Sequence, residues 1–265
     1  MNQDERHPHH RFGRRVENYR RYRPAYPQAV LSLLETAIGL TPQATIADVG
    51  AGTGIFSRLL LDYGCTVYGV EPNDEMRAAA AEDLAAYARF YPVAGSAAAT
   101  GLPPGSVDHI TAAQALHWFE PEGTREEFER ILRPRGAVVA VYNTWRGEDD
   151  PLLAAYDALM QRYDVEQGAS MATPVSVPQR LDTLFGAGGY RKATLPNIYH
   201  YDWETFHGGA LSHSYAPLPD SPAYESFLAE LRALFHNFAH DGVVRFPFTT
   251  RVAWGRPFDG RLPAR

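Results

Sequence analysis

Three alternate glycines stand beside an acidic residue in the segment Asp48-Val49-Gly50-Ala51-Gly52-Thr53-Gly54, where the short apolar run 45–49 ends. Glycine lets the backbone approach a ligand closely and adopt conformations that other residues rarely take. A second apolar run, residues 66–70, ends in Glu71. A carboxylate in that position accepts hydrogen bonds and suits the two hydroxyl donors of a ribose. The two motifs together indicate a site for a nucleotide-like ligand.

The glycine spacing differs from that of the dinucleotide fingerprint G-x-G-x-x-G/A. Ile55 occupies the third fingerprint position, and Gly54 falls one residue early. The chain also has no G-x-x-x-x-G-K-[S/T] phosphate loop. A dehydrogenase is therefore disfavoured, and binding of NAD is the observation that would reveal one.

The elements that must position these motifs alternate between strand and helix, which predicts a parallel sheet with helices on both faces. We expect strands near 45–49, 66–71, 90–94, 107–113 and 136–142, and helices near 28–38, 54–62, 73–88 and 121–133. After Trp145 the alternation breaks into a helix that follows Glu148, a Pro- and Gly-rich stretch (173–190), extended segments near 191–202 and 243–256, and helices near 203–211 and 222–239. The last two helices are interpreted as an insertion over the edge of the sheet.

The pattern Asp48-x-Gly50-x-Gly52-x-Gly54 with Glu71 closely resembles the first two motifs of class I S-adenosylmethionine-dependent methyltransferases. Further resemblances to the methyltransferase type 11 group lie in Arg11-Phe12, Tyr19, Arg23-Pro24, Tyr26-Pro27, Gly101-Leu102-Pro103 and Ser106-Val107-Asp108. The segments Gln114–Phe119 and Ser212–Leu218 resemble the branch that includes trans-aconitate methyltransferases.

The resemblance implies an α/β fold: a Rossmann-like, seven-stranded, mostly parallel sheet whose last strand is antiparallel, with helices on both faces, an N-terminal lid and a C-terminal helical insertion. We expect one methyltransferase domain over residues 1–265. It divides into a lid (1–27), a cofactor-binding core (28–145), a substrate-side insertion with the sixth strand (146–240) and the final strand (241–265).

The implied cofactor is S-adenosylmethionine. Its expected contacts are Tyr19, Arg23, Asp48, Gly50, Gly52, Gly54, Glu71, Pro72, Met76, Ser96, Ala97 and Gln114. Arg23 suits a bidentate clamp on the methionine carboxylate, with Tyr19 closing over it, although a solvated arginine face is the alternative. Relatives commonly carry an acid around Ala98, so here the backbone of Ser96 and Ala97 is expected to frame the adenine.

Gln114, His117 and Trp118 are the candidate catalytic residues, because they directly follow the fourth strand. Two mechanisms remain open. A carboxylate acceptor needs only hydrogen-bond donors to aim it, whereas an alcohol or phenol needs neutral His117 as a base that titrates near pH 6.5. Packing of both aromatic residues in the core is the structural alternative.

The expected function is methyl transfer to a small molecule, with a carboxylate or hydroxyl oxygen as acceptor. N-, C- or S-methylation, or S-adenosylmethionine binding without methylation, are the alternatives. A net charge of −6 argues against nucleic-acid binding, and no apolar run reaches the ~20 residues of a membrane span. One cysteine and the absence of a signal peptide favour the cytoplasm, and the histidine spacing predicts no metal. The sequence leaves the oligomeric state open.

Overall fold

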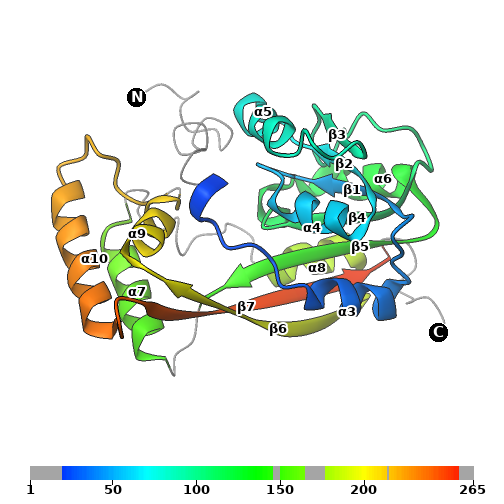
Figure 1. The fold of residues 1–265 in the computed structure, drawn as a ribbon. Coiled ribbons are helices and arrows are strands. Elements are labelled where there is room, and N and C mark those ends of the chain that lie inside the picture. The colour runs from blue at the N-terminus through cyan, green and yellow to red at the C-terminus, as the bar shows by residue number, and fades with distance from the viewer. Residues whose placement is uncertain (1–19, 146–149, 165–176, 214, 257–265) are drawn as a thin grey trace.

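The computed structural model describes residues 20–145, 150–164, 177–213 and 215–256. Within these residues, seven strands form one sheet in the order β3-β2-β1-β4-β5-β7-β6 (Figure 1). The strands are β1 (Thr45–Val49), β2 (Thr66–Val70), β3 (Phe90–Val93), β4 (Val107–Ala113), β5 (Leu132–Thr144), β6 (Tyr190–Tyr201) and β7 (Val244–Gly255). All neighbouring pairs are parallel except those of β7, which runs antiparallel to both β5 and β6. The expected mostly parallel, seven-stranded fold is confirmed.

Helices cover both faces of this sheet. Their bounds are α3 (Ala29–Ile38), α4 (Ile55–Tyr63), α5 (Asp74–Asp83), η2 (Leu116–Trp118), α6 (Pro121–Ile131), α7 (Pro151–Arg162), α8 (Val177–Phe185), α9 (Trp203–Leu211) and α10 (Tyr224–Phe238). One core joins the sheet to α3 and α4, and a second joins it to α6 and α8. The central strands are therefore buried on both sides and read as nearly continuous apolar runs.

A third core lies beyond the sheet proper, where β6 and β7 outrun their neighbour. These two strands pair along their whole length, from Tyr190 opposite Gly255 to Tyr201 opposite Val244. Strand β5 pairs only with residues 249–255 of β7. The free half of the β6–β7 ribbon carries α7, α9 and α10 around it, as Figure 1 shows. This second part of the molecule contains α9 and α10, which match the helices expected near 203–211 and 222–239.

Residues 20–27 link the two parts of the molecule. Arg20 pairs with Asp83 at the end of α5, and its Nε donates to Oδ2 at 2.8 Å. The next residue, Arg21, donates to Glu204 of α9 at 2.5 Å. We call residues 20–27 the N-terminal strap. Residues 1–19 of the expected lid lie outside the described residues.

Three expected boundaries differ from the structure. The helix expected over 73–88 ends at Asp83, and the strand expected over 136–142 extends over Leu132–Thr144. The Pro- and Gly-rich stretch 173–190 contains α8, whose buried side chains Leu181, Leu184 and Phe185 pack on the sheet. Pro178 hid this helix from sequence analysis, yet proline is well tolerated in the first helical turn.

Candidate functional site

The glycine turn between β1 and α4 is held by backbone groups and by one carboxylate. Gly50, Gly52 and Gly54 all have positive φ, at 69°, 57° and 81°. The carbonyl of Val70 accepts from the Gly50 N–H at 2.8 Å, and Glu71 Oε2 accepts from the Gly52 N–H at 2.9 Å. The turn therefore needs glycine, and Glu71 ties it to the end of β2.

Glu71 also joins the turn to the start of α5. Its Oε1 accepts from the Asn73 N–H at 3.0 Å, and the Asn73 side chain caps the helix by accepting from the Met76 N–H at 2.9 Å. A carboxylate oxygen has lone pairs beyond the one that each of these bonds uses. Glu71 can thus hold the turn and still accept from a ligand.

Asp48 lies beneath the turn with none of its surface exposed. Its carboxylate accepts from Ser57 Oγ at 2.6 Å and from Thr111 Oγ1 at 2.8 Å, which ties β1 to α4 and β4. Burial raises the pKa of this carboxyl to about 6, although both hydroxyls favour the charged form. The expected ligand contact of Asp48 is replaced by a supporting role under the turn.

Gly54 also supports the turn from behind. A Cβ at this position would meet Leu84 Cδ1 at 2.6 Å, so the residue faces the helix packing. Gly52 differs, because a Cβ there would meet nothing nearer than Met76 Sδ at 3.7 Å. Gly52 is the glycine that faces the open side of the turn.

A large cleft of about 1010 Å³ opens at the carboxyl ends of β1, β2 and β4. Its lining residues include eight of the expected cofactor contacts, namely Gly50, Gly52, Glu71, Pro72, Met76, Ser96, Ala97 and Gln114. Trp118, a candidate catalytic residue, lines it too, and the lining residues not expected from the sequence are Asn73, Ala98, Ala113, Ala115, Phe119 and Glu120. Each of these lies within a few residues of a motif that pointed to the cleft, and that proximity was the available signal.

The backbone at Ser96, where the sequence predicts an adenine contact, is already partly used within the protein. The Ser96 N–H already donates to the Ala99 carbonyl at 3.0 Å, and the Ser96 carbonyl accepts from the Ala99 N–H at 3.2 Å. Ala98 lines the cleft where relatives commonly carry an acid, and Glu120 supplies a carboxylate from the far side of β4. Glu120 is thus the second acidic lining residue beside Glu71.

A middle cavity of about 420 Å³ adjoins the cleft above the first turn of α4. It shares Gly50, Ala113 and Gln114 with the cleft. The unpaired N–H groups of a helix start favour an anion. Its lining residues are Arg23, Pro24, Tyr26, Gly50, Ala51, Ile55, Phe56, Ala113, Gln114 and Asn143.

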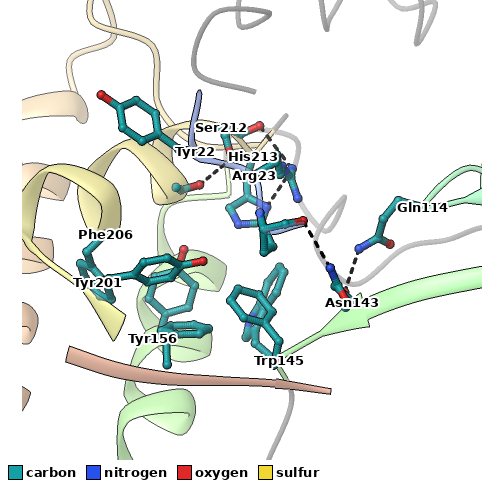
Figure 2. A pocket seen from close by; sticks show the side chains of 14 residues that line it. Tyr22, Arg23, Gln114, Asn143, Trp145, Tyr156, Tyr201, Phe206, Ser212 and His213 are labelled. Atoms are coloured by element: carbon teal, nitrogen blue, oxygen red, sulfur yellow. Dashed lines mark hydrogen bonds between the residues drawn. The ribbon is translucent and has the colours of Figure 1, made fainter. Parts of the chain in front are cut away.

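A third cavity, also of about 420 Å³, continues from the middle one into the helical insertion (Figure 2). We call it the aromatic cavity. Its lining residues are Tyr22, Arg23, Pro24, Gln114, Asn143, Trp145, Tyr156, Tyr201, Phe206, Gly209, Ser212, His213, Phe246 and Phe248. From the sequence, Trp145, Tyr142 and Tyr215 are candidates either for an aromatic substrate pocket or for core packing. Of the three, Trp145 lines this cavity, whereas Tyr156, Tyr201 and the β7 phenylalanines were not anticipated.

Gln114 lines all three cavities. Its backbone has a φ of 54°, which is uncommon for a residue other than glycine and is a feature of functional sites. Its side-chain amide donates to the Asn143 carbonyl at 2.8 Å. The side chain is thereby held at the junction of the cleft, the middle cavity and the aromatic cavity.

Arg23 of the N-terminal strap lines both the middle cavity and the aromatic cavity. One guanidinium nitrogen lies 3.3 Å from the Ser212 carbonyl and 3.3 Å from His213 Nδ1. Both of these partners line the aromatic cavity, as Figure 2 shows. Tyr19, the expected companion of Arg23, lies outside the described residues.

His117 and Trp118 occupy the short helix η2 after β4, but they face different surroundings. Trp118 is 42% exposed and lines the large cleft. The described residues that line the three cavities do not include His117, whose ring lies 4.8 Å from that of Trp118 and 6.0 Å from that of Tyr142.

Burial, with Arg180 and Arg23 nearby, lowers the pKa of His117 to about 4. The ring is therefore neutral at pH 7. The ordinary histidine pKa of about 6.5 does not include the effect of this burial.

Within the described part of the chain, no group of three His, Cys, Asp or Glu side chains is placed to hold a metal ion. None of its helices is both long and apolar enough to cross a membrane.

Comparison with known proteins identifies the segment that builds the cleft. Residues 47–140 match the family model described as a methyltransferase domain. An uncharacterized methyltransferase of Mycobacterium tuberculosis is 36% identical over 137 residues, which are 50% of this chain and 52% of that protein. A methyltransferase-like protein of Schizosaccharomyces pombe is 30% identical over 182 residues, or 67% of this chain and 66% of that protein.

The chain spans about half the length of the first curated relatives it matches. Among solved structures, one from Anaeromyxobacter dehalogenans, described as a type II methyltransferase, aligns with a TM-score of 0.62 at 22% identity and covers 89% of this chain and 98% of that one. This likeness supports the fold. S-adenosylmethionine is the cofactor that such a domain uses. The match from β1 into β5 shows that this chain carries a class I S-adenosylmethionine-dependent methyltransferase domain.

Proposed function

We propose that this chain transfers the methyl group of S-adenosylmethionine to an oxygen atom of a small molecule. The observation that carries the proposal is the row of three cavities that meet at Gln114. The adenosine occupies the large cleft, where Glu71 accepts from the ribose hydroxyls. The methionine end lies in the middle cavity, and the methyl acceptor occupies the aromatic cavity.

The reaction is an in-line displacement, in which an acceptor oxygen attacks the methyl carbon as the carbon–sulfur bond breaks. The electron pair goes to sulfur, so the sulfonium becomes the neutral thioether of S-adenosylhomocysteine. Positioning alone can supply much of the acceleration for such a step. Gln114 is the proposed positioning residue, because its side chain is held at the place where donor and acceptor meet.

A carboxylate is the acceptor that fits this chain better than an alcohol or phenol. A carboxylate is already ionised at pH 7 and needs no base. His117, the candidate base, has a pKa of about 4 and does not line the aromatic cavity. The resemblance of Gln114–Phe119 to the trans-aconitate methyltransferase branch points the same way. In this proposal Trp118 packs beside the cofactor and His117 supports the Trp118 ring.

The test is turnover by the purified chain with methyl-labelled S-adenosylmethionine and a panel of small acids, alcohols, amines and thiols. We expect a product heavier by one methyl group, formed from an acid and lost in alkaline hydrolysis as a methyl ester. Binding of S-adenosylhomocysteine is measured in parallel by calorimetry. Labelling of protein or nucleic acid alone, or cofactor binding without any methylated small molecule, contradicts the proposal.

A further inference from the structure

The large cleft has two ends. Gly50, Ala113 and Gln114 lie at the end that it shares with the middle cavity, where the proposed function places the methionine part of the cofactor. The lining residues 96–98 and 118–120 are not shared with the middle cavity. Because S-adenosylmethionine carries its methionine and its adenine on opposite sides of the ribose, the adenine belongs at this second end. We call it the base end of the cleft.

Two contacts hold α6 against the loop that follows β3. Glu127 Oε1, on α6, accepts from the Thr100 N–H at 2.8 Å. A Cβ at Gly123, in the first turn of α6, would lie 3.2 Å from Ala98 Cβ, so the start of the helix packs closely on a residue that lines the cleft. Glu120 is the N-cap residue of α6. The helix therefore fixes the place of Glu120 at the base end.

The Glu120 carboxylate is not used to hold the fold. Its side chain makes no cap hydrogen bond to α6, and the recorded bond of this residue uses its backbone carbonyl. Two arginines line a neighbouring small pocket together with Glu120, and each has another partner. Arg125 donates to Glu129 at 3.1 Å. Arg180 donates to the Phe119 carbonyl. The Glu120 carboxylate therefore remains available to a ligand.

The charged groups of the cleft are acceptors. Within the described part of the chain, its charged lining residues are Glu71 and Glu120, and neither lysine nor arginine lines it. Such a lining suits a ligand edge that presents hydrogen-bond donors. Adenine has one such group, the exocyclic amino group, beside ring nitrogens that accept.

Glu120 is the acceptor that best suits this amino group. Glu71 already accepts from the N–H groups of Gly52 and Asn73, and the proposed function assigns its remaining capacity to the ribose. The Ser96 carbonyl already accepts from one backbone N–H at 3.2 Å. A carboxylate forms a charge-assisted bond, which is about twice as strong as a bond to a neutral carbonyl.

We propose that Glu120 recognises the adenine of S-adenosylmethionine by accepting a hydrogen bond from its exocyclic amino group. The inference rests on the placement of the cofactor in the proposed function, and it adds a specificity-determining residue to that site. Trp118, which is 42% exposed and lines the same end, supplies a flat aromatic surface on which a base can stack. The acid comes from the start of α6, whereas Ala98 of the loop after β3 offers the base no polar side chain.

The test compares S-adenosylhomocysteine with its 6-deamino analogue, in which a hydrogen atom replaces the exocyclic amino group. Calorimetry with the full chain should give a dissociation constant about tenfold lower for S-adenosylhomocysteine, as for one hydrogen bond to a charged group. Glu120 is exposed, so the analogue leaves the carboxylate in water and the difference is limited to the bond itself. Equal affinities of the parent chain for the two ligands overturn the inference without any variant.

Variants then locate the acceptor. Glu120→Ala should reduce the preference for S-adenosylhomocysteine to less than about twofold, and Glu120→Gln, which keeps a neutral acceptor, to about threefold. The matched control is Glu126→Ala, an exposed acid on the same helix that lines neither the cleft nor the two cavities, and it should keep the full preference. The urea midpoint of both Glu120 variants should equal that of the parent, because this side chain makes no cap bond.

Two results with the variants overturn the inference. A preference that persists in Glu120→Ala would assign the amino group to a backbone carbonyl such as that of Ser96. An equal loss in Glu126→Ala would show an effect of net charge alone. Both results come from binding, so they are independent of turnover. A chain that shows the expected preference but methylates no small molecule supports the role of Glu120 and contradicts the proposed function.

Discussion

The two ends of the row of cavities are built in different ways. The cleft is made of backbone groups and short loops at strand ends, and its central contacts join residues about 20 positions apart, such as Gly52 and Glu71. The aromatic cavity is made of large side chains from residues 22 to 248 of the chain. A ligand that all members of a family share can be bound by backbone groups. A ligand that is specific to one member is recognised by its side chains.

The seam between the two ends is a polar network. Asn143 Oδ1 accepts from Thr250 Oγ1 at 2.6 Å and from Asn197 Nδ2 at 3.2 Å. The Asn143 side chain also donates to the Ala25 carbonyl at 3.2 Å. The backbone carbonyl of Asn143 accepts a hydrogen bond from the Gln114 side-chain amide. One residue thus fixes the N-terminal strap, the sheet and the junction residue together.

The largest expected effect lies in the glycine turn. In Gly50→Ala the new Cβ would meet Ala115 Cβ at 2.5 Å, and the φ of 69° is strained for alanine. Strain of about 1–2 kcal/mol and overpacking of about 1–3 kcal/mol together predict a loss of about 2–5 kcal/mol in the free energy of unfolding. Urea unfolding measures this loss, and cofactor binding should disappear.

The matched variant is Gly52→Ala, whose Cβ has room, with Met76 Sδ 3.7 Å away. It should cost about 1–2 kcal/mol from backbone strain alone. Equal losses for the two glycines would show that shape complementarity at Gly50 is not what fixes the turn.

The cleft was predictable because its determinants are local. The positive φ of three glycines, the acid at the end of β2 and the Asn73 cap are all encoded within residues 48–76. Local chemistry of this kind leaves a readable pattern. The sequence pattern did not show which of its two acidic residues faces the cleft. Asp48 and Glu71 look alike in sequence, and only packing buries the first completely.

The aromatic cavity was not predictable to the same degree, because its contacts are long-range. Asn143 bonds to Asn197 and Thr250, which lie 54 and 107 positions further along the chain. No sequence motif indicates such a network. In the sequence, Tyr156 and Tyr201 look like ordinary core aromatic residues. They meet at one cavity because β6 and β7 extend beyond β5 and α7 packs on this extension. The packing of His117 was unpredictable for the same reason. Its position directly after β4 suggested a catalytic role, but its half-buried ring does not line any of the three cavities.

The second prediction concerns the carboxylate of the cleft. Glu71→Gln places an amide where the N–H groups of Gly52 and Asn73 both need an acceptor. We expect S-adenosylhomocysteine affinity to fall roughly 10–100-fold, as for loss of a charge-assisted bond. The control is Glu75→Gln, an exposed acid in the first turn of α5. Calorimetry that gives unchanged affinity for folded Glu71→Gln would remove Glu71 from the site.

The third prediction tests the seam. Asn143→Ala leaves the Thr250 hydroxyl and the Asn197 amide short of a buried partner and should cost about 2 kcal/mol of stability. Thr250→Val removes one bond and should cost about 1 kcal/mol. Because the Asn143 side chain also holds the Ala25 carbonyl of the N-terminal strap, its variant should raise the acceptor KM more than the cofactor dissociation constant. If the two constants change in the same proportion, Asn143 acts only on the stability of the whole fold.

The smallest expected effect concerns His117, which lies outside both binding regions. Burial lowers its pKa from 6.5 to about 4. Between these two pH values the imidazole is therefore protonated in the unfolded chain but neutral in the folded protein. Stability is therefore lost as pH falls below about 6.5. His109 acts in the same direction, with a pKa lowered to about 4. Asp48 acts in the opposite direction, because its pKa is raised to about 6 and its protonation in the folded state adds stability as pH falls.

His117→Gln isolates the first of these contributions, since His109 and Asp48 are common to both proteins. Between pH 7 and pH 5 the parent should lose about 1–2 kcal/mol more of its free energy of unfolding than the variant. Urea unfolding at both pH values measures the difference. The turnover rate of the parent should stay flat between pH 6 and pH 8, because His117 remains neutral throughout that range. A rate that rises through pH 6.5 and collapses in His117→Gln would instead make His117 a base at the acceptor, and would move the chemistry from positioning to proton removal.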